Sequence, residues 1–195
     1  MKYLHLYENH KLRNFINVVK NAKQFSTDAH DGQFRKGGEP YIIHPDSVAK
    51  IVHDVKLSKK IAELIAAAYL HDVVEDTDMT LEDIKEQFGD LVMSLVSELT
   101  TDEEKLAISG KEEYLIDKML NMSSWALVIK LADRLHNLKD FHKIMNGDDE
   151  KRKAWVIRYA TQTKNIVKEI TWFRELTQSQ KVLVRRIKNG ISNYV

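Results

Sequence analysis

The sequence predicts an all-α fold, a single helical bundle, on the strength of three observations. No segment shows the sustained alternation of apolar and polar residues that a half-buried strand requires, whereas helical spacing of apolar residues recurs throughout. Only two prolines occur in 195 residues, Pro40 and Pro45, and three of the seven glycines lie just before them. Helix breakers are therefore concentrated in one loop, and the rest of the chain is expected to be helical.

Local signals place the helices along the chain. Pro45 is expected at the start of a helix, because its missing N–H would be unpaired there in any case. Thr80 and Asp83 resemble a capping box, and Gly89 is expected to end the helix that they begin. Residues 101–110 are expected to form a mobile connection. The other helices are expected near residues 11–30, 58–74, 91–99, 111–121, 124–141, 150–175 and 178–188.

Composition narrows the classes of function. Hydrophobic residues make up 43% and charged residues 30%, as in an ordinary globular protein, and the length suits one domain over residues 1–195. A formal charge of +1 gives no overall attraction to nucleic acid or membrane, so neither is expected as a partner. The lack of cysteine excludes thiolate metal sites and leaves His, Asp and Glu as the strong ligands. The charge-interrupted start is unlike a signal peptide or membrane span, so a cytoplasmic protein is expected.

The segment IAELIAAAYLHDVVED combines a buried helix with a cluster of polar groups. Its first ten residues are almost entirely apolar, and they run directly into His71 and Asp72. An ionised aspartate at the end of such a helix is costly unless it is paired, hydrogen-bonded or bound to a metal ion. Glu75 and Asp76 follow one turn later and would stack on the preceding pair if the helix continued. Taken alone, the segment is equally compatible with a solvated helix end.

A second polar cluster is expected on the helix over residues 124–141. Lys130, Asp133 and Asn137 are three and four residues apart, so they share one face of that helix. The immediate neighbours of Asp133 are apolar, which places its carboxylate in an apolar wall. A solvated polar face is the commoner meaning of this spacing when it is considered by itself.

The loop DGQFRKGGEPYIIHP supplies a third group of candidates. His44 precedes Pro45, where it could act either as a ligand or only as a capping side chain. Arg35 and Lys36 could be ordinary surface charges. Their setting among glycines, however, would let backbone and side chains approach a phosphate closely.

Three strings, AHDGQFRKGGEPYIIHP, AAAYLHDVVEDTDMT and VIKLADRLHNLKDF, occur in this order and resemble the hydrolase domain of the RelA/SpoT family of the HD superfamily. The resemblance covers a motif-bearing core over residues 22–141, with a helical part over residues 142–195 behind it. No nucleotide-synthesising domain fits in the remainder. The chain is therefore expected to be a stand-alone small alarmone hydrolase, similar to the metazoan SpoT homologue.

The resemblance also implies roles for individual residues. It implies four ligands for one divalent ion, usually manganese in this family: His44, His71, Asp72 and Asp133. It implies two catalytic acids beside the metal, Glu75 and Asp76. It implies three residues that face the substrate: Arg35, Lys36 and Asn137. A mixed imidazole and carboxylate set suits Mn²⁺ or Fe²⁺, with Zn²⁺ possible. The implied reaction removes the 3′-pyrophosphate of (p)ppGpp, giving GDP or GTP and pyrophosphate.

Two other functions remain open from the sequence. The same site could act on another phosphorylated purine nucleotide, such as ppApp or NADPH, because the choice of base depends on the shape of the pocket. A non-catalytic nucleotide sensor is the second alternative. The presence of both Glu75 and Asp76 argues against it, because a protein that only binds needs neither acid.

Residues beyond Phe141 carry no recognisable motif. The Trp and Tyr residues of WVIRYATQTKNIVKEITWF are expected in the core rather than as base-stacking groups. The basic stretch KVLVRRIK is expected to be a solvated helix face rather than an RNA-binding surface.

Overall fold

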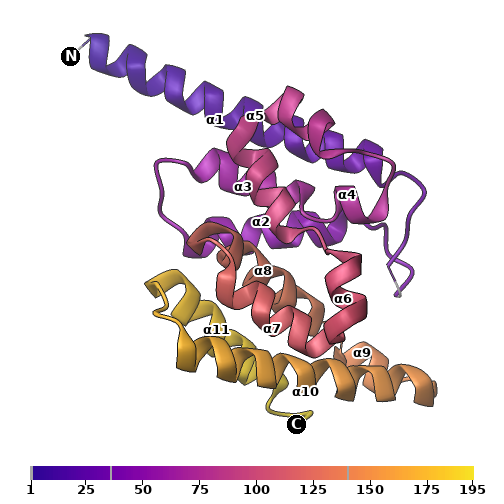
Figure 1. Cartoon of the computed structure of the whole chain (residues 1–195). Helices are drawn as coiled ribbons and strands as arrows, with labels where there is room; N and C mark the ends of the chain where they lie inside the picture. The colour runs from indigo at the N-terminus through magenta and orange to yellow at the C-terminus, as the bar shows by residue number, and fades with distance from the viewer. Residues whose placement is uncertain (1, 36, 140) are drawn as a thin grey trace. The chain divides into compact units, whose positions relative to one another are not determined.

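The computed structural model describes residues 2–35, 37–139 and 141–195, and every regular element within those ranges is a helix (Figure 1). Extended pairing in the described part of the chain is limited to a single bridge between Phe34 and Pro40. The prediction of an all-α fold is confirmed. The chain divides into two compact units, Met1–Thr100 and Thr101–Val195.

The first unit is built around α3 (Ile61–Leu70). Residues 64–70 of this helix are all buried, because it is apolar on nearly every side. Three helices pack against it: α1 (Lys2–Ala29), α2 (Ile43–Val55) and α5 (Leu81–Leu99). Phe25 of α1 and Phe88 of α5 also meet edge to face, with ring centroids 5.6 Å apart.

The end of α3 differs from the sequence-based expectation in a way that shapes the candidate site. The helix ends at Leu70 rather than near residue 74, and His71 and Asp72 form a turn before the short α4 (Val73–Asp76). The two acidic residues of α4 therefore do not continue the helical register of α3. His71 Nδ1 lies 2.8 Å from the Ala68 carbonyl, one of the carbonyls near the point where the helix ends.

The start of α5 follows the prediction. Thr80 and Asp83 form the predicted capping box, in which each side chain bonds to the backbone of the other. Gly89 interrupts the helical geometry with φ 82° and ψ 173°, a conformation open essentially only to glycine. The chain resumes helical geometry immediately afterwards, so Gly89 ends the first helical segment of α5, as predicted, and a second segment follows it at a kink.

The second unit is organised by α8 and α10. α8 (Ser124–Leu138) is buried along most of its length and packs against α11 (Gln178–Ile191). Three helices pack against α10 (Glu150–Phe173): α7 (Lys111–Asn121), α9 (Phe141–Met145) and α11. Arg174 donates to the carbonyls of Met119 and Leu120, at 2.9 and 3.0 Å, and so satisfies the C-terminal end of α7.

The connection over residues 101–110, which was expected to be mobile, contains α6 (Glu103–Ser109), whose first turn is capped by Asp102 through the Lys105 N–H at 3.0 Å. One expectation for this unit is wrong. Trp172 was expected in the core, yet it is 81% exposed. In contrast, Trp155 and Tyr159 do pack against the fully buried Phe141. No helix in the described ranges is both long and apolar enough to cross a membrane.

Candidate metal centre

Three polar side chains converge in the first unit where α2 begins and α3 ends. His44 and His71 are buried, with relative exposures of 2% and 1%, and their Nε2 atoms lie 3.2 Å apart. Asp72 brings its Oδ2 atom to 3.1 Å from Nε2 of His71 and to 3.5 Å from Nε2 of His44. Two imidazoles and one carboxylate, from helices that are distant in sequence, therefore direct their donor atoms to one point.

The hydrogen bond that His71 makes through Nδ1 limits what its other ring nitrogen, Nε2, can bind at the point where the three side chains converge. A carbonyl only accepts hydrogen bonds, so Nδ1 of His71 must carry the proton that bonds the Ala68 carbonyl. In the neutral ring, Nε2 then presents a lone pair toward Asp72 Oδ2, another acceptor, at 3.1 Å. Two acceptors at that distance repel each other unless a proton or a metal ion lies between them, so the contact is either an ion pair of a protonated ring or a position for a metal ion. An imidazole held in this tautomer is also the arrangement that metal-binding histidines use.

The spacing of the three donor atoms fits a transition-metal ion. Ligand atoms bound at about 2.1 Å and at right angles to one another are about 3.0 Å apart, close to the separations within this cluster. A mixture of imidazole nitrogen and carboxylate oxygen suits Mn²⁺, Fe²⁺ or Zn²⁺. On chemistry and spacing alike, the residues present fit a divalent ion.

Tyr41 connects this cluster to α4. Its hydroxyl lies 2.7 Å from Asp72 Oδ2 and 2.8 Å from Asp76 Oδ2. A hydroxyl has one proton, so it can donate to only one of the two carboxylates at a time. Partial burial, together with the charges of Asp72 and Glu75, raises the pKa of Asp76 above its usual range. The shared hydroxyl therefore links the carboxylates of Asp72 and Asp76.

Two further side chains support Tyr41, and sequence reasoning assigned a role to neither of them nor to Tyr41 itself. The ring of His30 stacks on Tyr41 with centroids 4.4 Å apart. Gln33 accepts from His30 Nδ1 through Oε1 at 2.9 Å and donates through Nε2 to the backbone carbonyl of Asp76 at 2.8 Å. All three lie in the loop string that resembles the family motif, so the signal was present, but their contacts depend on the folding of the loop over α4.

The basic loop forms a tight turn. Arg35 N–H donates to the Glu39 carbonyl and Gly38 N–H donates to the Arg35 carbonyl, both at 2.8 Å, and Gly38 has φ 85°. This turn holds Arg35 partly buried. The other predicted cation, Lys36, lies outside the described residues. The side chain of Glu75 is exposed on α4.

The remaining predicted residues lie in the second unit, on one face of α8. Asp133 is 7% exposed, and its carboxylate is 3.3 Å from Lys130 Nζ and accepts from Asn137 Nδ2 at 2.7 Å. Asn137 also lies 3.4 Å from the hydroxyl of Tyr159. The three polar residues do share a face, as predicted. The face is not the solvated one that this spacing commonly indicates, because Asp133 is buried and offers a carboxylate of the kind that binds divalent ions.

Comparison with known proteins identifies the family. Residues 22–166 match the HD domain family. The chain belongs to the HD domain family. A guanosine-3′,5′-bis(diphosphate) 3′-pyrophosphohydrolase of Haemophilus influenzae is 41% identical over 118 residues, which are 57% of this chain and 17% of that protein. The bifunctional (p)ppGpp synthase/hydrolase SpoT of Escherichia coli is 39% identical over 130 residues, which are 64% of this chain and 18% of SpoT.

A solved structure extends the similarity over most of the chain. A metazoan orthologue of SpoT that hydrolyses ppGpp superposes with a TM-score of 0.72 at 27% identity, and the match covers 90% of this chain and 96% of that one. The HD domain of this protein is therefore of the RelA/SpoT type, as the three motifs predicted. The chain spans less than a fifth of the length of the two bacterial relatives.

Proposed function

We propose that this HD domain protein is a metal-dependent hydrolase that removes the 3′-pyrophosphate of (p)ppGpp and releases GDP or GTP with pyrophosphate. The observation that carries the proposal is the convergence of His44, His71 and Asp72 on one point at separations of 3.1–3.5 Å. The relatives named for the same reaction supply the choice of substrate.

The proposed ligands of the ion are the three converging side chains and Asp133. Asp133 is included because it matches the fourth ligand of the family motif and because its carboxylate is buried. Manganese is proposed as the ion on the strength of the family resemblance. A divalent ion bound there supplies Lewis-acid stabilisation of the charge that develops on the phosphoryl oxygen during hydrolysis.

Glu75 and Asp76 are proposed to handle the proton of the attacking water. Asp76 suits this role because its pKa is raised, so that it exchanges a proton closer to neutrality than an ordinary aspartate does. Tyr41 holds the Asp76 carboxylate in place through the 2.8 Å contact. Glu75, on the same short helix, is the second acid available to orient the water.

The substrate is proposed to lie with its pyrophosphate toward the Arg35–Lys36 turn and its nucleoside toward Asn137. Cations on a glycine-containing turn suit a pyrophosphate, since they offer charge-assisted hydrogen bonds to its oxygens. Asn137 is held by Asp133 and lies next to the Tyr159 hydroxyl, which leaves its amide oriented for hydrogen bonding.

A substrate screen tests the proposal. The purified chain, supplemented with Mn²⁺, is incubated with ppGpp, ppApp and NADPH, and the release of pyrophosphate is measured separately from the release of phosphate. We expect pyrophosphate from ppGpp, with a turnover that disappears when the metal is chelated. Phosphate release from NADPH alone, or pyrophosphate release from ppApp alone, would replace the proposed substrate. The absence of any turnover, with nucleotide binding retained, would support a sensor instead.

A further inference from the structure

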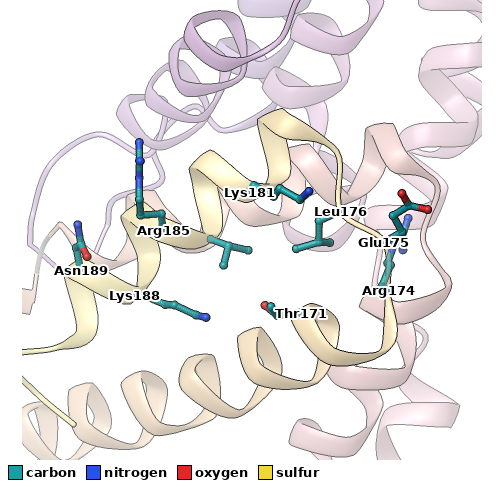
Figure 2. Close-up of a pocket in the computed structure, with 9 residues that line it drawn as sticks. Thr171, Arg174, Glu175, Leu176, Lys181, Arg185, Lys188 and Asn189 are labelled. Carbon is teal, nitrogen blue, oxygen red and sulfur yellow. The ribbon is translucent and has the colours of Figure 1, made fainter.

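The second unit contains a hollow that the HD domain match does not account for. It lies between α10 and α11, has a volume of about 540 Å³, and is formed entirely by residues that follow residue 166, where the family match ends (Figure 2). This volume lies within the range typical of small-molecule sites. Its lining consists of Thr171, Arg174, Glu175, Leu176, Lys181, Val184, Arg185, Lys188 and Asn189.

The charge of this hollow is strongly one-sided. Four cationic side chains line it, against the single carboxylate of Glu175. Arg174 is engaged with the backbone carbonyls at the end of α7. Within the described part of the chain, the side chains of Lys181, Arg185 and Lys188 make no hydrogen bond or ion pair. Figure 2 shows Lys188 reaching from α11 toward Thr171 of α10, while Arg185 extends along the outer side of α11.

The three cations of α11 are spaced at positions i, i+4 and i+7, so they share one helix face. Like charges at this spacing destabilise a helix slightly, and Glu175 is the one carboxylate among the residues that line the hollow with them. Lys181 and Lys188 are seven residues apart, or about 10 Å along the helix axis. An extended anion such as a polyphosphate chain can therefore contact both lysines with their side chains in place along the helix.

A second hollow adjoins the first and has a different character. It has a volume of about 490 Å³ and shares Thr171 and Lys188 with the first. Val167, Trp172 and Ile191 give it an apolar surface, and two more lysines, Lys164 and Lys168, also line it. Trp172 is 81% exposed, so one face of its indole is open to a planar ligand. A cationic compartment thus lies next to an apolar compartment with an available aromatic ring.

We propose that this α10–α11 groove binds a nucleoside polyphosphate, at a site other than the metal centre. The phosphates lie along Lys181 and Lys188, and the base lies against Trp172. The pairing of an extended cationic row with a stacking surface fits this class of molecule. An inorganic anion has no apolar part to place against Trp172, and a fatty acid has only one charge for the two lysines and no planar ring to stack on the indole.

The test measures GTP binding to the full-length chain by equilibrium dialysis and by tryptophan fluorescence. GTP is suitable because it has no 3′-pyrophosphate. We expect the Lys181→Ala/Lys188→Ala variant to bind GTP at least about tenfold more weakly at this site. Arg186→Ala is the matched control, because Arg186 is exposed on the same helix but does not line either hollow. It is expected to bind like the wild type.

The stacking contact is tested by a second matched pair. Trp172→Ala is expected to weaken GTP binding about fivefold or more. Phe173→Ala, which removes a neighbouring exposed ring that lines neither hollow, is expected to have no effect. Inorganic tripolyphosphate should respond to the lysine changes and be indifferent to Trp172→Ala.

Three results would overturn the proposal. The first is GTP binding that is unchanged in the double lysine variant. The second is equal weakening in Arg186→Ala, which would indicate only a diffuse positive field. The third is tight binding of a short single-stranded RNA, sensitive to Lys181 and Trp172, by a chain that does not bind GTP. Circular dichroism of each variant shows whether a loss of binding reflects a loss of fold.

Discussion

The hydrogen bond between His71 Nδ1 and the Ala68 carbonyl is the contact that gives the His44–His71–Asp72 cluster its chemistry. It fixes the tautomer of a buried ring and turns a lone pair toward a carboxylate. That arrangement is unfavourable by itself and favourable around a cation. The same cluster, with the other tautomer, would be an ordinary network of buried hydrogen bonds.

Removing one proposed ligand should therefore remove the ion. Asp72→Ala and Asp133→Ala are each expected to reduce bound manganese well below one ion per chain, because each removes one of the two carboxylates among the four proposed ligands, and carboxylate oxygens suit manganese best. Metal content is measured by inductively coupled plasma mass spectrometry after dialysis. Asp54→Ala, at an exposed aspartate of α2, is the control. Retention of both metal and activity in Asp72→Ala would contradict the site assignment.

Substitution of the two acidic residues of α4 should separate metal binding from catalysis. Glu75→Ala and Asp76→Ala are expected to keep the metal and to lose about 10²–10⁴-fold in turnover, the range typical of general acid–base groups. Asp78→Ala removes an exposed carboxylate two residues further along and should keep the wild-type rate. Wild-type rates in both Glu75→Ala and Asp76→Ala would exclude these acids from the mechanism.

The two ends of the substrate should respond to different residues. Lys36→Glu is expected to raise KM for every nucleotide tested, because a phosphate contact carries no information about the base. Asn137→Ala is expected to impair nucleotide cleavage without affecting metal content or the hydrolysis of a pyrophosphate ester that lacks the base. If Asn137→Ala slows both substrates equally, then Asn137 serves the metal centre and the proposed orientation is wrong.

At the scale of elements, short interruptions in otherwise helical segments position the site. The break after Leu70 turns His71 and Asp72 away from the axis of α3 and allows α4 to begin separately. The Gly38 turn brings Tyr41 back to α4. The kink at Gly89 joins the two helical segments of α5. An uninterrupted helix would not place His71, Asp72 and Tyr41 where they lie.

The bend in α5 provides a stability prediction. Gly89→Ala is expected to lower the free energy of unfolding by about 1–3 kcal/mol, because φ 82° with ψ 173° is accessible essentially only to glycine. An added Cβ would contact no atom within 4 Å, so the effect isolates the backbone conformation. Gly37→Ala, where φ is not positive and the space is also open, is the control and should change stability little. Urea denaturation measures both variants.

At the scale of the whole molecule, the proposed ligands come from both compact units, and the HD domain match over residues 22–166 includes parts of both. A metal ion that binds the folded chain and not the unfolded chain stabilises the folded state by mass action. Saturating Mn²⁺ at roughly 100 times its dissociation constant should add about 2.7 kcal/mol to the free energy of unfolding. Thermal melts with and without EDTA measure this, and the increase in Tm should vanish in Asp72→Ala. An equal increase in that variant would indicate nonspecific binding.

The sequence by itself determined the all-α class, the RelA/SpoT-type HD domain, the capping box at Thr80 and the shared face of Asp133 and Asn137. These follow from periodicity, from local capping chemistry and from motifs whose spacing is short. The family resemblance also implied that His44 meets His71 and Asp72. Only the tertiary structure decided the separations within that cluster, that Tyr41 joins Asp72 to Asp76, and that Trp172 is exposed at the end of α10. Those outcomes depend on which helices pack together and where each one breaks, and helical spacing carries no information on contacts between side chains that are distant in the chain.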